Sequence, residues 1–140
     1  MAAGNSPIVE AIARAETGTT GEIRVHLSKR WFEKDPLGRA MQLFEQFGMF
    51  RTTRRNAVIL YVNLRKRRMA IFGDTGIHDK VGQAFWEKIL AELAHDLRTT
   101  HHEKAVAEAI FKIGDVLKAH FPIGAGDDNM DELPNTVTTD

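Results

Sequence analysis

The chain has 140 residues, of which 43% are hydrophobic, 27% charged and 8% aromatic, which fits one compact domain and excludes a disordered body. It contains no cysteine, which excludes disulfides, thiolate zinc sites, iron–sulfur clusters and cysteine nucleophiles. No stretch approaches the roughly 20 apolar residues of a membrane-spanning helix. The segment from Met1 to Ser6 has no feature of a secretion signal, so we expect a cytoplasmic protein.

The formal charges cancel, with 19 basic and 19 acidic residues, but they are distributed unevenly. The last twenty residues contain no Lys or Arg and five acidic residues, namely Asp127, Asp128, Asp131, Glu132 and Asp140. The rest of the chain therefore carries a net charge of +5. We interpret residues 1–121 as one domain and 122–140 as an acidic tail. Its glycines, proline and closing Thr-Val-Thr-Thr are typical of coil or a loosely attached strap.

Helices and strands alternate in the first part of the chain. A serine followed by proline, and then apolar residues at helical spacing, predict a helix over about 7–17. Residues 22–28 alternate between apolar and polar, which predicts a strand with one polar face near a sheet edge. An Asp-Pro pair begins a second predicted helix over 36–48. The aromatic pair in segment 29–35 favours either an extra short strand or an exposed aromatic loop.

A hairpin is predicted in the middle of the chain. Residues 57–62 are continuously apolar and rich in β-branched side chains, which is typical of a central strand buried on both faces. A tight polar connection over 63–66 leads to a returning strand over 68–72. Because both faces of the central strand need cover, we expect helices on both sides of the sheet.

Two helices are predicted after the hairpin. Apolar residues four apart indicate one over about 80–97, and Thr100 and Glu103 have the spacing of a capping box for another that ends near Phe121. The predicted order is therefore helix, strand, helix, strand, strand, helix, helix. This order favours an α/β sandwich with a small mixed sheet.

The segment Gly73-Asp74-Thr75-Gly76-Ile77-His78-Asp79 joins a predicted strand to a predicted helix, where ligands bind in α/β proteins. Asp74 and Asp79 could supply oxygen ligands to a hard cation such as Ca²⁺. Alternatively, Asp79 caps the helix that follows. Asp74-Thr75-Gly76 also has the sequence of the aspartic protease triplet, but its single copy in a largely helical chain favours an ordinary turn.

Other candidate groups are less specific. The six histidines form no His-Glu-x-x-His motif, and we retain only His26, on the polar face of the first strand, as a candidate. The segment from Arg51 to Arg68 contains seven basic residues and no acidic one, a pattern that suggests nucleic-acid binding. Its two basic clusters flank a strand and so lie roughly 20 Å apart. We interpret them as solvated strand ends and expect no nucleic-acid partner.

Several segments together resemble one known family, the TPM-domain family, over about residues 7–121. The matching segments, in the family's order and spacing, are Gly21-Glu-Ile-Arg-Val-His26, Asn56 to Val62, Arg68 through Gly76, and the helix containing Phe85-Trp86. The acidic tail is similar to that of short, unanchored bacterial members. The resemblance implies a three-layer α/β/α domain. In this resemblance, the residues that match family positions around the loops are Asn56, Arg68, Gly73, Asp74, Gly76 and Asp79.

The resemblance also implies candidate functions. Plant members are associated with photosystem II repair and acid phosphatase activity, and some members are reported to bind Ca²⁺. This chain departs from the family at Ala57, where glycine is usual, and at 77–79, where Ile-His-Asp replaces Gly-Leu-Glu. We therefore predict a binding or accessory module for an unidentified protein partner, with a weak Ca²⁺ site at 73–79. A weak metal-dependent acid phosphatase is the alternative.

Overall fold

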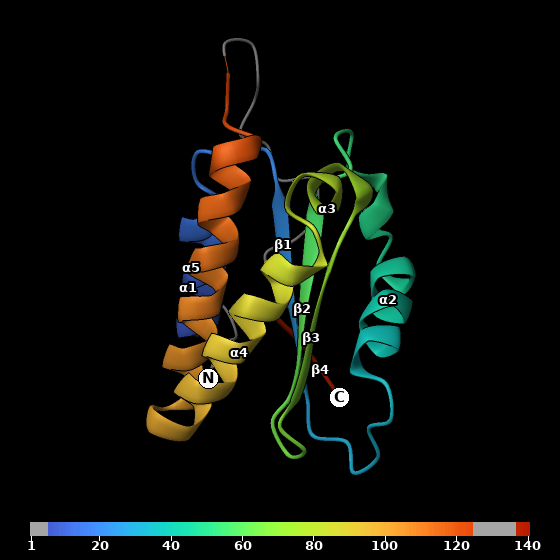
Figure 1. The fold of residues 1–140 in the computed structure, drawn as a ribbon, viewed down its shortest axis with the longest axis vertical. Coiled ribbons are helices and arrows are strands. Elements are labelled where there is room, and N and C mark those ends of the chain that lie inside the picture. The colour runs from blue at the N-terminus through green and yellow to red at the C-terminus, as the bar shows by residue number, and fades with distance from the viewer. Residues whose placement is uncertain (1–5, 125–136) are drawn as a thin grey trace.

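The computed structural model describes residues 6–124 and 137–140, which form one mixed sheet with helices on both faces (Figure 1). In chain order the elements are α1 (Pro7–Glu16), β1 (Glu22–Ser28), α2 (Pro36–Gln46), the short 3-10 helix η2 (Met49–Arg51), β2 (Ala57–Asn63), β3 (Arg68–Gly73), α3 (Thr75–Val81), α4 (Gln83–Thr99), α5 (His102–His120) and β4 (Val137–Thr139).

The sheet has four described strands in the order β3-β2-β1-β4. β1 and β2 run parallel in the register Glu22 to Ala57, and α2 forms the crossover between them. β2 and β3 are antiparallel and joined by a tight turn, as the hairpin prediction requires. The predicted mixed sheet is therefore confirmed.

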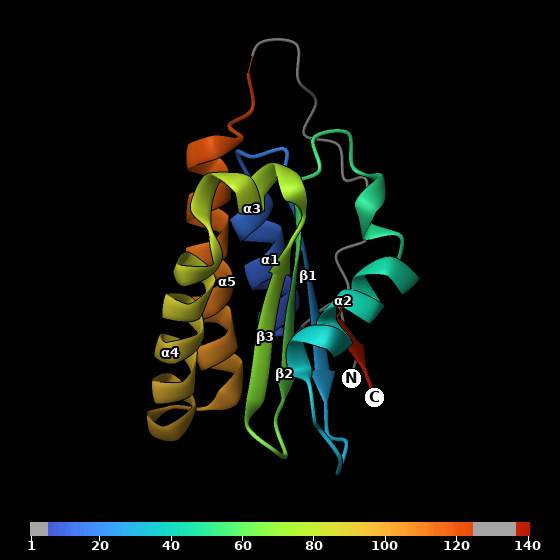
Figure 2. The ribbon, with the colours of Figure 1, turned by 45° about the vertical axis from the view of Figure 1, so that its right-hand side comes forward.

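The fold has three layers, and β2, the central strand of the predicted hairpin, lies in the middle one. α1, α4 and α5 cover one face of the sheet, and α2 covers the other (Figures 1 and 2). All seven residues of β2 are buried. Val58, Leu60 and Val62 belong to the larger core cluster with α1, α4 and α5, whereas Ile59 and Tyr61 pack in a smaller cluster with α2. The prediction that this strand is covered on both faces is confirmed.

β1 lies next to the edge of the sheet, as predicted, but it is not itself the edge strand. β1 is an interior strand because β4 pairs with it in parallel, in the register Val25 to Val137. The interpretation of the closing residues as coil is therefore wrong for 137–139. The other acidic residues of the tail, within 125–136, lie outside the described residues. As a result, the polar face of β1 is buried rather than solvated.

Helix boundaries after the hairpin also differ from the prediction. The chain forms α3 and then α4, because Gly82 adopts a left-handed φ of 80° between them. His101, not Thr100, caps α5 and accepts a hydrogen bond from the Glu103 backbone N–H. Segment 29–35 forms an exposed loop, which was one of the two predicted alternatives, and not a strand. Among the described residues, no helix combines the length and apolarity needed to cross a membrane.

Ile59→Asp should unfold the domain, since Ile59 is fully buried beneath α2 and an unpaired buried carboxylate costs several kcal/mol against a total stability of about 5–15 kcal/mol. Ile59→Val is the matched control and should cost only about 0.5–1.5 kcal/mol. Thermal melts followed by circular dichroism test both. A cooperative transition of Ile59→Asp at the parent temperature would contradict the placement of β2.

Candidate functional site

The loop that follows β3 begins with a helix cap. Asp74 is the N-cap of α3, and its Oδ1 accepts a hydrogen bond from the Thr75 backbone N–H at 2.7 Å. The Asp74 backbone N–H donates to the Ala57 carbonyl at 2.9 Å, which continues the hairpin pairing to the start of β2. The Asp74 side chain is thereby fixed and buried where β3 ends and α3 begins.

The two glycines of this loop are required by close packing. A Cβ at Gly73 would lie 2.8 Å from the indole of Trp86. A Cβ at Gly76 would overlap the carbonyl oxygen of Arg54 and lie 2.6 Å from that of Arg55. The Gly76 backbone N–H instead donates to the Arg55 carbonyl at 2.7 Å. Gly73 thus lets the end of β3 approach α4, and Gly76 lets α3 approach the segment before β2, which are structural roles.

Asp74 forms a two-point ion pair with Arg55. Arg55 Nε lies 2.7 Å from Oδ2, and Arg55 Nη2 lies 2.8 Å from Oδ1. The hydrogen bonds to Asp74, followed by its negative charge, raise the pKa of Arg55 above its ordinary value. The Asp74 side chain is only 3% exposed, whereas that of Arg55 is 51% exposed. A buried carboxylate is therefore neutralised by a cation that reaches it from the surface.

Asp79 does not join Asp74 in this ion pair. It is exposed within α3, and the cap of that helix is Asp74, while Gly82 precedes α4. The prediction that Asp79 caps a helix is therefore wrong. His78 accepts a hydrogen bond from the indole N–H of Trp86 at 3.1 Å. Residues 6–124 and 137–140 contain no group of three or more His, Asp or Glu side chains arranged to hold a metal ion.

The remaining family positions fall at two ends of the sheet. Asn56 is buried next to Arg55, and its Nδ2 donates to Thr20 Oγ1 at 3.1 Å. The buried Asn56 Oδ1 has no hydrogen-bond partner among the described residues. Arg68 lies at the other end of the hairpin, paired with Asn63. The structure therefore brings Asn56, Gly73, Asp74 and Gly76 to one end and leaves Arg68 at the opposite end.

His26 belongs to a separate group, the His26 cluster, in which His26 and Tyr61 are buried and Arg39, Thr138 and Asp140 lie nearer the surface. His26 Nδ1 lies 2.7 Å from Thr138 Oγ1, and Nε2 lies 3.1 Å from Asp140 Oδ2. Arg39 Nη2 donates to the same carboxylate oxygen at 2.7 Å. The rings of His26 and Tyr61 stack with their centroids 5.7 Å apart. His26 therefore links β1 to β4 and is only 3% exposed.

The electrostatics of the His26 cluster follow from this enclosure. Burial lowers the pKa of His26, against the opposing effect of Asp140. Burial alone would raise the pKa of Asp140, but hydrogen bonds from Ser28, Arg39 and His26 outweigh it and hold that pKa at about 2. Nδ1 is occupied by Thr138 of β4, and Nε2 faces the Asp140 carboxylate, so the imidazole is held among protein groups while β4 is in place. Sequence reasoning retained His26 but missed its partners, because Thr138 and Asp140 are more than one hundred residues away along the chain.

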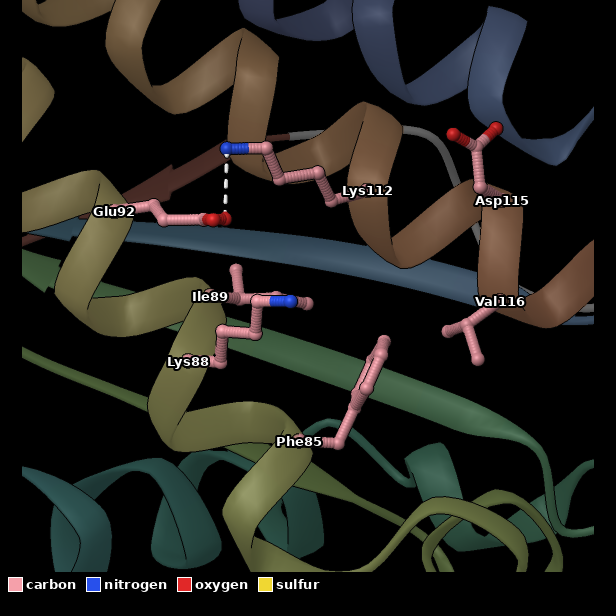
Figure 3. Close-up of a pocket in the computed structure, with 7 residues that line it drawn as sticks. All are labelled: Phe85, Lys88, Ile89, Glu92, Lys112, Asp115 and Val116. Carbon is pink, nitrogen blue, oxygen red and sulfur yellow. Dashed lines mark ion pairs between the residues drawn. The ribbon is translucent and has the colours of Figure 1, made fainter.

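A hollow between α4 and α5, of about 410 Å³, is distinct from both groups. Phe85 and Val116 extend into the space between the helices, and Lys112 Nζ pairs with Glu92 at 3.0 Å on one side (Figure 3). The hydrogen bond from Lys112 lowers the pKa of Glu92. None of the residues predicted as site residues lines this hollow.

Comparison with known proteins agrees with this architecture. The model of the TPM domain matches residues 2–116. The chain belongs to the TPM-domain family. The BA42 protein of the psychrophilic bacterium Bizionia argentinensis, solved by NMR, is 37% identical over 95% of this chain and 90% of that chain, with a TM-score of 0.83.

A second solved structure shares the TPM-like fold alone. The N-terminal domain of a protein from P. gingivalis is 16% identical over 80% of this chain and 72% of that chain, with a TM-score of 0.67. No curated protein matches the sequence.

The His26 cluster should make the stability of this TPM domain fall as the pH drops below about 6.5. Because the pKa of His26 is lower in the folded state than in the unfolded chain, the unfolded chain takes up the proton first. A second loss should follow below about pH 4, as the unfolded chain protonates Asp140 before the folded protein does. Melting temperatures of the parent protein between pH 7 and pH 3 measure both losses.

Two variants isolate the His26 contribution. In His26→Gln the melting temperature should fall less between pH 7 and pH 5 than in the parent protein. In His120→Gln, which removes an exposed imidazole, the fall should be the same as in the parent. Equal pH dependence in the parent and His26→Gln would contradict the assignment.

Proposed function

We propose that this TPM domain is a binding module whose loop 73–79 takes up a divalent cation, Ca²⁺ being the best match, with Asp74 as the principal ligand. The observation that carries the proposal is the ion pair between a buried carboxylate and a half-exposed guanidinium. A buried carboxylate needs a positive charge beside it, since a lone buried charge is strongly destabilising. A hard cation with oxygen ligands meets the same need.

Ca²⁺ can bind at this site only when Arg55 leaves Asp74. Its side chain is 51% exposed and can rotate into water, where it keeps its charge. Ca²⁺ would then take its place on the two oxygens of Asp74, with water and nearby oxygens completing the coordination shell. Asn56 Oδ1, which has no described hydrogen-bond partner at this end of the sheet, is a further candidate oxygen. Asp79, exposed in α3, is a candidate ligand through water.

Competition from Arg55 predicts weak binding. With one buried carboxylate, the expected dissociation constant is that of water-rich extracellular sites, about 10⁻⁴–10⁻³ M. A site of this affinity suits an accessory role in which the cation or a partner protein is bound reversibly. The buried Asp74 is fixed by the cap and by β3, so its carboxylate is already in position when Arg55 moves away.

Calorimetric titration of Ca²⁺ into the metal-free protein should give weak binding that disappears in Asp74→Asn. In Arg55→Gln, which removes the competing cation, binding should tighten, and Ca²⁺ should raise the melting temperature more than in the parent, because it restores a charge to the buried carboxylate. Asp79→Asn measures the contribution of the second carboxylate.

Asp115→Asn is the matched control, since it removes an exposed carboxylate on α5. Absence of both heat and stabilisation in the parent and in Arg55→Gln would refute the cation site. Equal losses in Asp74→Asn and Asp115→Asn would indicate nonspecific binding to surface charge.

A weak metal-dependent acid phosphatase is the second candidate, because the same buried carboxylate would supply its metal ligand. We expect turnover of p-nitrophenyl phosphate to be feeble or absent at acid and neutral pH, with and without divalent cation, since a dedicated phosphatase needs a nucleophile or a fuller metal centre. Turnover that is lost in Asp74→Asn and retained in Asp115→Asn would favour the enzyme over the binding module. Turnover that is equal in both variants would belong to a contaminant or another site.

A further inference from the structure

Two segments far apart in the sequence meet at the end of the molecule opposite α3. The loop 29–35 after β1 and the turn 64–67 between β2 and β3 both extend to the lower end of the molecule (Figures 1 and 2). Arg65 Nε donates to the Lys29 carbonyl at 2.6 Å, and the Arg65 guanidinium lies 3.9 Å from the centre of the Trp31 ring. Asn63 Nδ2 also donates to the Arg30 carbonyl at 3.1 Å. We call residues 29–34 and 64–68 the aromatic–basic tip.

The tip exposes two adjacent aromatic side chains. Trp31 is 66% exposed and Phe32 is 84% exposed, the highest values among the large hydrophobic residues that the structure describes. Trp86, in contrast, is fully buried. Burying an aromatic side chain is strongly favourable, so two exposed neighbouring rings indicate a contact surface.

The charges around these rings are mostly positive. The tip carries seven exposed basic residues: Lys29, Arg30, Lys34, Arg65, Lys66, Arg67 and Arg68. Its acidic neighbours are held by other groups. Glu33 accepts hydrogen bonds from Tyr61 Oη and from Asn63 Nδ2, and Asp35 caps α2. The nearby Asp140 is paired with Arg39 and His26. The surface of the tip is therefore aromatic and strongly positive.

A groove beside Phe32 adds a place for an anionic group. This groove, of about 590 Å³, lies between the tip and α2. It is lined by three basic residues, Arg30, Lys34 and Arg39, and by two acidic ones, Glu33 and Asp35, and Arg39 is paired with Asp140, so Arg30 and Lys34 are the groups that would meet a phosphate. A phosphate in it would lie next to the exposed ring of Phe32. Aromatic rings at the level of lipid headgroups, with Lys and Arg on the phosphates, are the usual pattern of peripheral membrane contact.

We propose that the aromatic–basic tip docks on the surface of an anionic phospholipid bilayer, with Trp31 and Phe32 entering the headgroup region and the basic side chains on lipid phosphates. A bilayer fits better than a single-stranded nucleic acid for two reasons. Nucleic-acid binding of that kind uses a groove that follows the backbone for several nucleotides, whereas the rings stand at the end of the molecule. In addition, the Arg65 guanidinium already lies over the ring of Trp31.

Tryptophan fluorescence reports on the tip directly. The chain has two tryptophans, and because Trp86 is fully buried, a change in the emission of the folded protein comes from Trp31. Vesicles of phosphatidylcholine and phosphatidylglycerol should shift this emission to shorter wavelength, and sedimentation should show bound protein. Pure phosphatidylcholine vesicles should do neither. Raising the ionic strength to about 0.15 M, where charges are screened beyond about 8 Å, should weaken the binding.

Matched variants separate the two contributions to binding. Phe32→Ser should reduce vesicle affinity roughly tenfold, whereas Phe50→Ser, which removes an exposed ring from η2 at the other end of the sheet, should not. Neutralising Lys34 and Lys66 together to glutamine should reduce affinity roughly 25-fold. Changing Arg51 and Lys80 together to glutamine removes the same amount of charge from the opposite end of the molecule and should have little effect on vesicle affinity.

Three results would overturn the proposal. The first is an unchanged emission and no sedimentation with anionic vesicles. The second is an equal loss of binding in the tip variants and their controls. The third is tight binding of a labelled oligonucleotide that Phe32→Ser and the Lys34 and Lys66 changes abolish while vesicles stay unbound, which would make the tip a nucleic-acid surface. We expect no such oligonucleotide complex.

Discussion

The burial of β2 on both faces is the constraint on which the rest of the structure depends. Its seven residues are all buried, and the side chains alternate between two separate core clusters. One cluster requires α1, α4 and α5, and the other requires α2. The crossover helix and the hairpin then determine where each end of the sheet lies. As a result, the loop containing Asp74 and the aromatic–basic tip are held at opposite ends of the hairpin.

The parts of the fold that the sequence predicted are those determined by neighbouring residues. The apolar run 57–62, the hairpin and the helical stripes are local patterns, and the structure contains them. The position of β1 near the edge was predicted, but its pairing with β4 was not, because β4 is more than one hundred residues away and only three residues long. Alternating polar residues look the same in sequence whether they face water or buried partners.

The candidate site was predictable in position but not in detail. The strand-to-helix loop directed attention to Asp74, yet the partner of Asp74 could not be inferred. Arg55, which pairs with it, adopts a left-handed φ of 52°, a conformation that a non-glycine residue rarely takes and that the sequence does not reveal. Likewise, His26 was retained as a candidate without its partners, since Arg39 and Asp140 approach it through tertiary packing. Trp31 and Phe32 were recognised as a possible exposed loop, but their contact with Arg65 depends on the adjacent turn.

The pairing of β4 with β1 also has a consequence for association between copies of the chain. A three-residue edge strand is the part of a sheet that opens most readily, and its amide hydrogens should exchange with solvent earlier than those of β2. Each opening leaves β1 as an edge with free backbone groups, which favours pairing with another molecule. The side chain of Arg24 lies on this strand over the ring of Phe47, and a charged residue that points inward from an edge opposes such pairing. The polar face of β1 therefore limits aggregation at the moment when the sheet is least protected.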